Sequence, residues 1–213
     1  RYISVTGVQT CALPISTQII CTIPFSKLRA VKGLQDLKFS ELKKEAILTQ
    51  SYATQSKGVL VYDSPFWRNK MGNTSANLGN FTGDFLSQKM WDSGRTQETK
   101  QGILTYQRGG ESGAEAGAGA PLQAAADLGL FYPDVALKDI RDSQAVNWTQ
   151  KTWAEGSIAV FKKNQYMRYK GVAAEPEYGG KFLFAGEHTS QLYAGTLQGA
   201  LDSGLQAAAA VSL

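Results

Sequence analysis

The chain contains few of the residues on which several classes of protein function depend. Its 213 residues include only two cysteines, Cys11 and Cys21, and one histidine, His188. A disulfide framework is therefore excluded, and no metal site is expected. No apolar run approaches the length that crosses a bilayer. Lys and Arg are scattered and the net charge is only +4, so we do not expect a nucleic-acid-binding surface.

What remains is the composition of a globular, soluble protein. Hydrophobic residues make up 43% of the chain and charged residues 19%, which is enough for a core of one or two small domains. Strand-like runs alternate with helical patterns along the sequence, so the composition and the order of elements together predict an α/β protein.

The first residues do not resemble a natural protein segment. Residues 5–15, VTGVQTCALPI, are similar to a common sequencing adapter translated in frame, and the chain has no initiating Met. We therefore expect residues 1–16 to be non-native and joined to a truncated gene, which makes Cys11 non-native too. A natural leader peptide is the alternative, although a signal sequence needs a basic region before a longer apolar stretch. Any targeting signal then lies upstream, and the compartment is left open.

Periodicity and turn residues predict several short elements. The expected strands are residues 19–23, 58–62, 103–106, 158–161 and 181–185. The expected helical regions are residues 25–48, 122–132 and 195–210. Ser40 is placed to cap a helix, and Pro121 stands where a first helical turn tolerates proline. Residues 69–94 are interpreted as loops, and the small residues of 109–120 as a mobile loop.

The C-terminal strand and helix are the most informative part of the sequence. After the strand, Gly186 and Glu187 form a turn, and the helix that follows has apolar residues on one face. Small residues on this helix allow close approach to a sheet or a flat ligand: Gly199, Ala200, Gly204 and Ala207. The helix start favours an electron-rich partner. Ordinary packing is the alternative interpretation of such a unit.

Residues 184–208, FAGEHTSQLYAGTLQGALDSGLQAA, resemble the C-terminal FAD motif of the flavin-containing amine oxidase family, which includes monoamine and L-amino-acid oxidases. The resemblance implies that Glu187, beside Gly186, contacts the ribityl-pyrophosphate part of FAD. It also implies that the helix start points at the pyrimidine edge of the flavin, through Gly195, Thr196, Leu197 and Gln198. A solvated turn carboxylate is the alternative for Glu187. His188 is assigned no catalytic role.

Two further segments are similar to the same family and occur in the same order. In SKGVLVYDSPFWR, residues 56–68, Lys57 matches the lysine that supplies an ammonium near flavin N5. In NWTQKTWAEGSIAVFKKNQY, residues 147–166, Trp148 matches a tryptophan that packs near the flavin. Gly156 matches the glycine of the strand that passes in front of the ring. A solvated lysine and a core aromatic are the alternatives for Lys57 and Trp148.

Departures from the family pattern narrow the expected chemistry. Monoamine oxidases carry a flavin-linked cysteine and an aromatic residue where this chain has Ser157 and Ile158, so FAD is expected to bind noncovalently. Thr196 stands where the second aromatic of their substrate cage would follow Gly195. The resemblance places Ile158, Tyr193 and Thr196 on the substrate side, and the identity of the amine or amino acid stays open.

No GxGxxG motif follows a strand anywhere in the chain, although that turn brings backbone onto the FAD pyrophosphate. We therefore expect an incomplete Rossmann-like FAD domain whose N-terminal part is missing. Residues 17–26 and 171–213 belong to it in this interpretation, and residues 27–170 form an inserted α+β substrate domain.

The expected function is oxidation of an amine or amino acid to an imine, with oxygen as acceptor and hydrogen peroxide as product. The partners are the small-molecule substrate and oxygen, and a homodimer is among the open arrangements. The alternatives are a related flavin desaturase or protoporphyrinogen-oxidase-like enzyme, or a noncatalytic protein that kept the fold. The fragment alone is expected to be inactive.

Overall fold

The structure is a computed structural model that describes residues 16–69, 79–134 and 136–211. Residues 1–15 and Cys11 within them lie outside the described residues, so the interpretation of that segment as non-native stays a prediction. The chain forms two compact units, Arg1–Gln50 with Lys162–Leu213, and Ser51–Phe161. Among the described residues, no helix is both long and apolar enough to cross a membrane.

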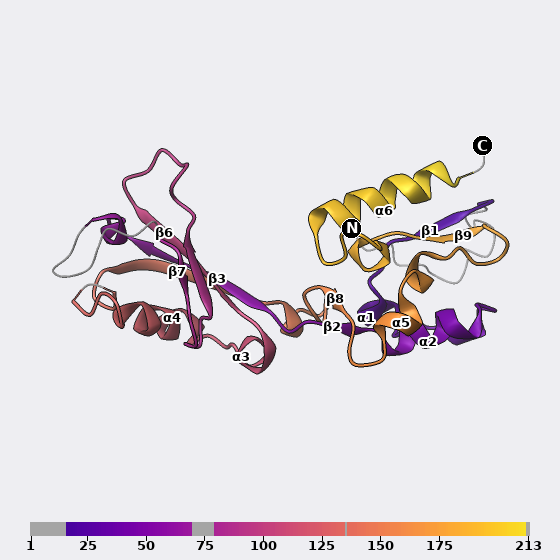
Figure 1. Cartoon of the computed structure of the whole chain (residues 1–213), viewed down its shortest axis with the longest axis horizontal. Helices are drawn as coiled ribbons and strands as arrows, with labels where there is room; N and C mark the ends of the chain where they lie inside the picture. The colour runs from indigo at the N-terminus through magenta and orange to yellow at the C-terminus, as the bar shows by residue number, and fades with distance from the viewer. Residues whose placement is uncertain (1–15, 70–78, 135, 212–213) are drawn as a thin grey trace, which may run out of the picture. The chain divides into compact units, whose positions relative to one another are not determined.

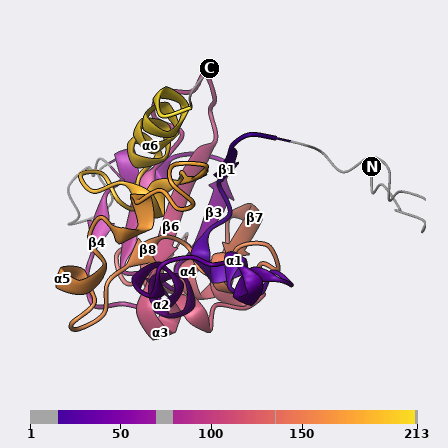
Figure 2. The same cartoon turned by 90° about the vertical axis from the view of Figure 1, so that its right-hand side faces the viewer.

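The first unit is built around a pair of parallel strands, with helices on both sides (Figure 1, Figure 2). Short 3₁₀ turns lie between its longer elements, at Leu34–Asp36, Val172–Ala174 and Glu187–Thr189. The elements are β1 (Ile19–Cys21), α1 (Phe25–Leu28), α2 (Glu41–Thr49), α5 (Tyr166–Tyr169), β9 (Phe182–Phe184) and α6 (Leu197–Ala209).

Alternation along β9 explains how this unit packs. Successive side chains of a strand point to opposite faces, and the rings of Phe182 and Phe184 both contact Phe39, with centroids 5.0 and 5.7 Å away. Leu183 points the other way and packs with Ala207 of α6. One strand therefore holds helices on both of its faces.

A fully buried lysine completes the α2 side of this unit. The Nζ of Lys43 donates hydrogen bonds to the carbonyls of Ala173 (3.0 Å) and Glu175 (2.8 Å). It lies 4.0 Å from the ring centroid of Phe184. Burial lowers the pKa of Lys43 to about 8. These bonds tie α2 to the segment that leads into β9, because a buried ammonium must keep its acceptors.

The second unit is an antiparallel five-stranded sheet in the order β4-β5-β6-β3-β7, with a separate pair β2-β8. Its strands are β2 (Ser51–Tyr52), β3 (Ser56–Tyr62), β4 (Phe81–Thr82), β5 (Lys89–Asp92), β6 (Gly102–Arg108), β7 (Ile140–Asn147) and β8 (Ala159–Val160). Its helices are α3 (Gly110–Ala114) and α4 (Ala120–Gly129). The predicted α/β class is confirmed at the level of mixed strands and helices.

The two faces of the five-stranded sheet differ sharply. One face is buried under α4 (Figure 1), and its core side chains are Leu60, Tyr62, Met90, Leu104 and Tyr106 from the strands, with Ala124, Ala125 and Leu128 from the helix. The alternate residues of the same strands, beginning with Lys57 and Val59 on β3, are exposed or half-buried. We call this second side the open face.

Gly58 on β3 is required by close packing on the buried face. A Cβ atom at this position would lie 2.3 Å from Cζ of Tyr106, whose side chain is fully buried. We predict that Gly58→Ala lowers the free energy of unfolding by about 2 kcal/mol, because an overpacked ring cannot move aside. Gly117→Ala is the matched control, since its Cβ would meet only one atom, at 4.0 Å. Urea unfolding of both variants measures the difference, and equal stabilities would contradict the prediction.

Several sequence-based expectations hold and others fail. Ser40 caps α2, accepting from the backbone N–H of Lys43 at 3.3 Å, and Pro121 lies in the first turn of α4 as predicted. The mobile loop predicted for residues 109–120 is wrong, because α3 and the start of α4 occupy it. Asn147 holds this segment by donating to the carbonyl oxygens of Ala114 and Ala116, at 2.8 and 3.0 Å.

The strands β2, β4, β5 and β7 were not predicted, and the misses of β7 and β5 have a physical explanation. β7 is rich in polar residues, because it lies at the edge of the sheet and most of its side chains are exposed or half-buried. β5 lies in the region interpreted as loops, and among its four residues Met90 alone is fully buried. Residues 70–78 of that region lie outside the described residues.

The contact-based units and the expected domains divide the chain at different places. The units change at residues 50/51 and 161/162, whereas the sequence suggests changes at 26/27 and 170/171. The assignment of FAD and substrate to particular ranges is a functional prediction that contacts alone do not test.

Candidate flavin and substrate sites

In the first unit, the turn after β9 is fastened to the start of α6. The carboxylate of Glu187 accepts a hydrogen bond from the backbone N–H of Gly195 at 2.7 Å. Gly186, at φ +138°, donates its N–H to the hydroxyl of Ser203 at 2.9 Å. Ser203 lies about two helical turns into α6. These two hydrogen bonds therefore join the turn after β9 both to the start of α6 and to its middle. The role of Ser203 was not predicted, and its only signal is a hydroxyl on an otherwise apolar helix.

The start of α6 is capped by Thr196. Its hydroxyl accepts from the backbone N–H of Gly199 at 3.0 Å and donates to the carbonyl of Tyr193 at 2.7 Å. A Cβ on Gly199 would lie 2.2 Å from that same carbonyl oxygen, so the loop can approach the helix only at a glycine. Among the described residues, the N–H groups of Leu197 and Gln198 have no hydrogen-bond acceptor. This leaves two donors at the positive end of the helix dipole.

The buried face of α6 is its small-residue face, made of Gly199, Ser203 and Ala207. The leucines predicted to share one apolar face lie on exposed positions, with 92% of Leu197 accessible and more than half of Leu201 and Leu205. Small residues therefore let α6 pack closely on β9, as the sequence suggests.

His188, directly after Glu187, is buried rather than part of an open turn. Its ring lies 4.7 Å from that of Phe25, and its Nε2 has no hydrogen-bond partner within the described ranges. A Cβ on Gly186 would come within 2.6 Å of its ring. Burial, together with the charge of Lys43, lowers the pKa of His188 to about 4. The imidazole is therefore neutral near pH 7.

The depressed pKa of His188 predicts a loss of stability in acid. Between about pH 6.5 and pH 4, His188 is protonated in the unfolded chain but stays neutral in the folded chain. The free energy of unfolding should therefore fall by roughly 3 kcal/mol as pH decreases through this window. His188→Phe should remove that part of the pH dependence. Because His188 is the only histidine, one NMR imidazole signal reports its titration, and a midpoint near 6.5 would contradict the prediction.

In the second unit, Lys57 lies exposed on β3, on the open face of the sheet. Its Nζ is 5.7 Å from the ring centroid of Trp91 on β5. The aromatic neighbour was not predicted, because the registers of β3 against β6 and of β6 against β5 bring it close. Lys57 thus has an indole ring, and no carboxylate, as its observed contact in the described part of the chain.

The other predicted residues of this unit gather around residues 52–55. The N–H of Trp148 donates to the carbonyl of Gln55, and the N–H of Ala53 donates to the carbonyl of Ile158 at 2.8 Å. Gly156 packs on Tyr52, where an added Cβ would lie only 2.5 Å from the tyrosine Cβ. The side chain of Trp148 is 43% exposed. It is therefore not a core aromatic of this unit.

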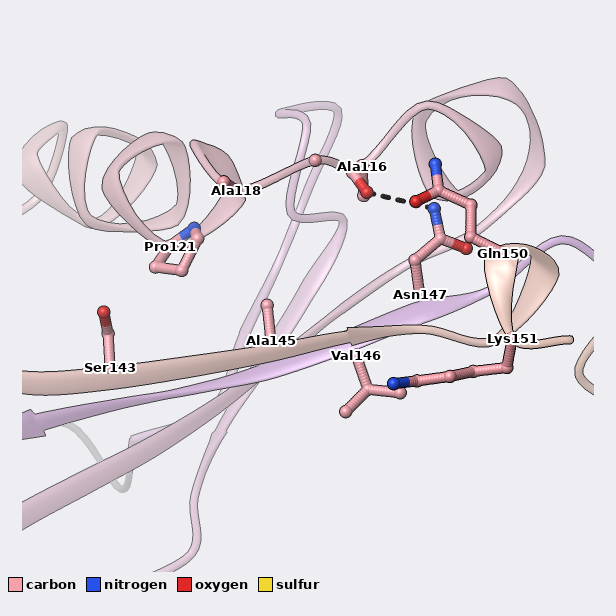
Figure 3. A pocket seen from close by; sticks show the side chains of 10 residues that line it. Ala116, Ala118, Pro121, Ser143, Ala145, Val146, Asn147, Gln150 and Lys151 are labelled. Atoms are coloured by element: carbon pink, nitrogen blue, oxygen red, sulfur yellow. Dashed lines mark hydrogen bonds between the residues drawn. The ribbon is translucent and has the colours of Figure 1, made fainter.

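A cavity of about 430 Å³ lies between β7 and the start of α4. Figure 3 shows its side chains, among them Pro121, Ser143 and Asn147. None of the predicted site residues lines it. The amide of Asn147 is already bonded to backbone carbonyls, so the cavity belongs to the packing of α3 and α4.

Solved structures of amine oxidases have a fold similar to that of this chain. Putrescine oxidase with bound putrescine has a similar structure, with a TM-score of 0.74 and 19% identity over 90% of this chain and 42% of that chain. Cyclohexylamine oxidase from Brevibacterium oxydans IH-35A gives a TM-score of 0.74 and 19% identity, over 91% and 42%. The fold is that of the corresponding part of these oxidoreductases.

The family itself follows from the sequence. Residues 16–212 match the profile of the family described as flavin containing amine oxidoreductase, and the chain belongs to that family. The protein named Putative L-amino-acid oxidase YobN, of Bacillus subtilis (strain 168), is 27% identical over 89% of this chain and 39% of its own length. The chain thus spans about two fifths of the relatives that it matches.

Proposed function

We propose that this chain is the C-terminal part of an FAD-dependent oxidase that converts an amine or amino acid to an imine, with oxygen as acceptor and hydrogen peroxide as product. Membership of the flavin containing amine oxidoreductase family supports the chemistry. The hydrogen bond between Glu187 and Gly195 carries the proposal, because it joins the two halves of the expected cofactor motif. The inserted substrate domain and the truncated Rossmann-like FAD domain are part of the same proposal.

The first unit offers groups that suit FAD. The Glu187 carboxylate accepts a hydrogen bond from the backbone N–H of Gly195. It can also accept a hydrogen bond from a hydroxyl group of the ribityl chain of FAD. The N–H groups of Leu197 and Gln198, next to Gly195 and the Thr196 cap, offer two donors to an electron-rich ring edge. When bound, FAD supplies the hydride-accepting chemistry, and the protein orients it and adjusts its charge.

Residues of the second unit serve the reaction and the substrate in this proposal. Lys57 holds a water by its ammonium, and Trp148 offers an exposed aromatic face. Ile158 belongs to the substrate side, as do Tyr193 and Thr196 of the first unit. The substrate loses two electrons and two protons as its carbon–nitrogen bond becomes an imine, which water hydrolyses. Oxygen takes up the same two electrons and two protons to form peroxide.

Noncovalent FAD binding is also proposed. Ser157, in place of the flavin-linked cysteine of monoamine oxidases, donates its hydroxyl to the carbonyl of Ala53 at 2.9 Å. The cysteine that the structure describes, Cys21, is buried on β1. Ser157 has no thiol, and the thiol of Cys21 is buried, which supports a flavin held without a covalent bond.

The test is peroxide release by the complete protein that contains this chain. Purified protein is given putrescine, cyclohexylamine and a set of L-amino acids, and peroxide is measured with and without catalase. We expect at least one compound to give peroxide in step with oxygen uptake and ammonia release. Absence of peroxide and of flavin reduction with every compound of this set would contradict the proposal, and flavin reduction by compounds without an amine would then favour a desaturase.

A further inference from the structure

Two lysines flank one glutamine on the open face of the five-stranded sheet. Gln107 of β6 is the register partner of Lys57 on β3 and also of Lys89 on β5. Directly paired residues of neighbouring strands point to the same side of a sheet. The two ammonium groups therefore rise from the same face, separated by two strand spacings or about 10 Å at their backbones.

The indole ring of Trp91 lies near the ammonium groups of both Lys57 and Lys89. Trp91 follows Lys89 by two residues, so it points to the same face. The Nζ atoms of Lys57 and Lys89 lie 5.7 and 6.0 Å from its ring centroid. Both distances are within the range of cation–π attraction. Trp91 thus offsets part of the repulsion between two like charges and keeps them over one half-buried surface.

A third lysine belongs to the same side of the sheet. Val146 on β7 is the register partner of Lys57. In Figure 3 the side chain of Lys151 is drawn on the same side of β7 as that of Val146, opposite Ala145. The open face therefore carries Lys151, Lys57 and Lys89 from one edge strand across to β5. We call these three residues the lysine row.

The strands supply little negative charge beside the lysine row. Among the strand residues that the structure describes, Asp142 is the sole acid on the open face. It stands four residues along β7 from Val146, about 13 Å at the rise of a strand. Asp92 points to the other face, where Arg68 binds it at 2.7 Å. An excess of positive charge on a sheet face attracts anions and repels cations.

We propose that the lysine row binds the carboxylate of the substrate, with Lys89 as the binding cation and Lys151 adding to the positive charge of the face. The substrates are then amino acids, and amines without a carboxylate are poorer. This inference rests on the oxidase function proposed above, in which Lys57 serves the reaction. The Trp91 ring beside the row offers an apolar surface to the substrate side chain, while a second cationic group, as in a diamine, meets repulsion.

Matched substrate pairs test this proposal in the complete oxidase. L-leucine with 3-methylbutylamine, L-phenylalanine with 2-phenylethylamine, and L-ornithine with putrescine differ only by the carboxylate. We expect a higher kcat/KM for the acid in every pair. Lys89→Gln should lower kcat/KM for the acids about tenfold, mainly through KM, as for loss of one hydrogen bond to a charged group. The decarboxylated partners should be unaffected.

A readout independent of turnover uses benzoate as the anionic probe. Its dissociation constant, followed by the change in flavin absorbance, should rise about tenfold in Lys89→Gln. Lys151→Gln is a second variant with the same expected direction. Lys138→Gln, an exposed lysine in the loop before β7, is the control and should change neither benzoate binding nor kcat/KM.

Preference for the amines, or equal losses for both members of a pair, would overturn the lysine row as a carboxylate site. So would benzoate binding that is the same in both variants and the control. Failure of the oxidase function gives a different result, because then no member of any pair reduces the flavin.

Discussion

Replacing Lys57 with methionine in the complete oxidase is expected to slow anaerobic flavin reduction by amine substrate about 100-fold, the usual scale for loss of a group that handles a proton or its water. Methionine keeps the length and apolar stem of lysine but removes all three N–H donors. Lys57 is exposed on β3, which pairs with both β6 and β7, so the fold should tolerate the change.

Stopped-flow absorbance measures this rate, and the flavin content of each variant corrects for lost cofactor. Lys138→Met is the control, because this exposed lysine lies outside the strands. If Lys57→Met were reduced as fast as the parent protein, Lys57 would be only a solvated lysine at the start of a strand.

Replacing Glu187 with alanine is expected to weaken FAD binding about 30-fold, by the loss of charge-assisted hydrogen bonds. The carboxylate has two tasks, since it holds the Gly195 N–H at 2.7 Å and is the proposed partner of the ribityl chain. Glu187→Gln retains an acceptor for Gly195 but loses the charge, so an intermediate affinity is expected.

Quenching of FAD fluorescence on binding to apoprotein measures these affinities. Glu98→Ala, in the exposed loop between β5 and β6, serves as the control. Unchanged affinity in Glu187→Ala, with an unchanged melting temperature, would show that Glu187 is a solvated turn residue.

The sequence predicted local structure best at positions where a residue type has one well-defined structural role. Ser40 accepts a hydrogen bond at the first turn of α2, and Pro121 lies in the first turn of α4. In both cases the signal is local, so neighbouring residues are sufficient to determine it. The strand and helix of the C-terminal motif were predicted within a few residues for the same reason.

Long-range pairing could not be predicted in this way. The contact of Lys57 with Trp91 depends on two strand registers, that of β3 with β6 and that of β6 with β5. Neither register can be predicted from the residues next to Lys57 or Trp91. Asn147 likewise orders α3 from more than thirty residues away, so a glycine- and alanine-rich segment that suggests a mobile loop forms a helix. The buried His188 also depends on Phe25, far away in the sequence.

The flavin content of the complete protein tests the proposed FAD site most directly. We expect the purified protein to be yellow, to release FAD into solution on heat denaturation because no covalent bond holds it, and to bleach when its substrate is added without oxygen. A protein that is colourless as purified, and stays colourless after incubation with FAD, would contradict the assignment of Glu187 and the start of α6 to a flavin site.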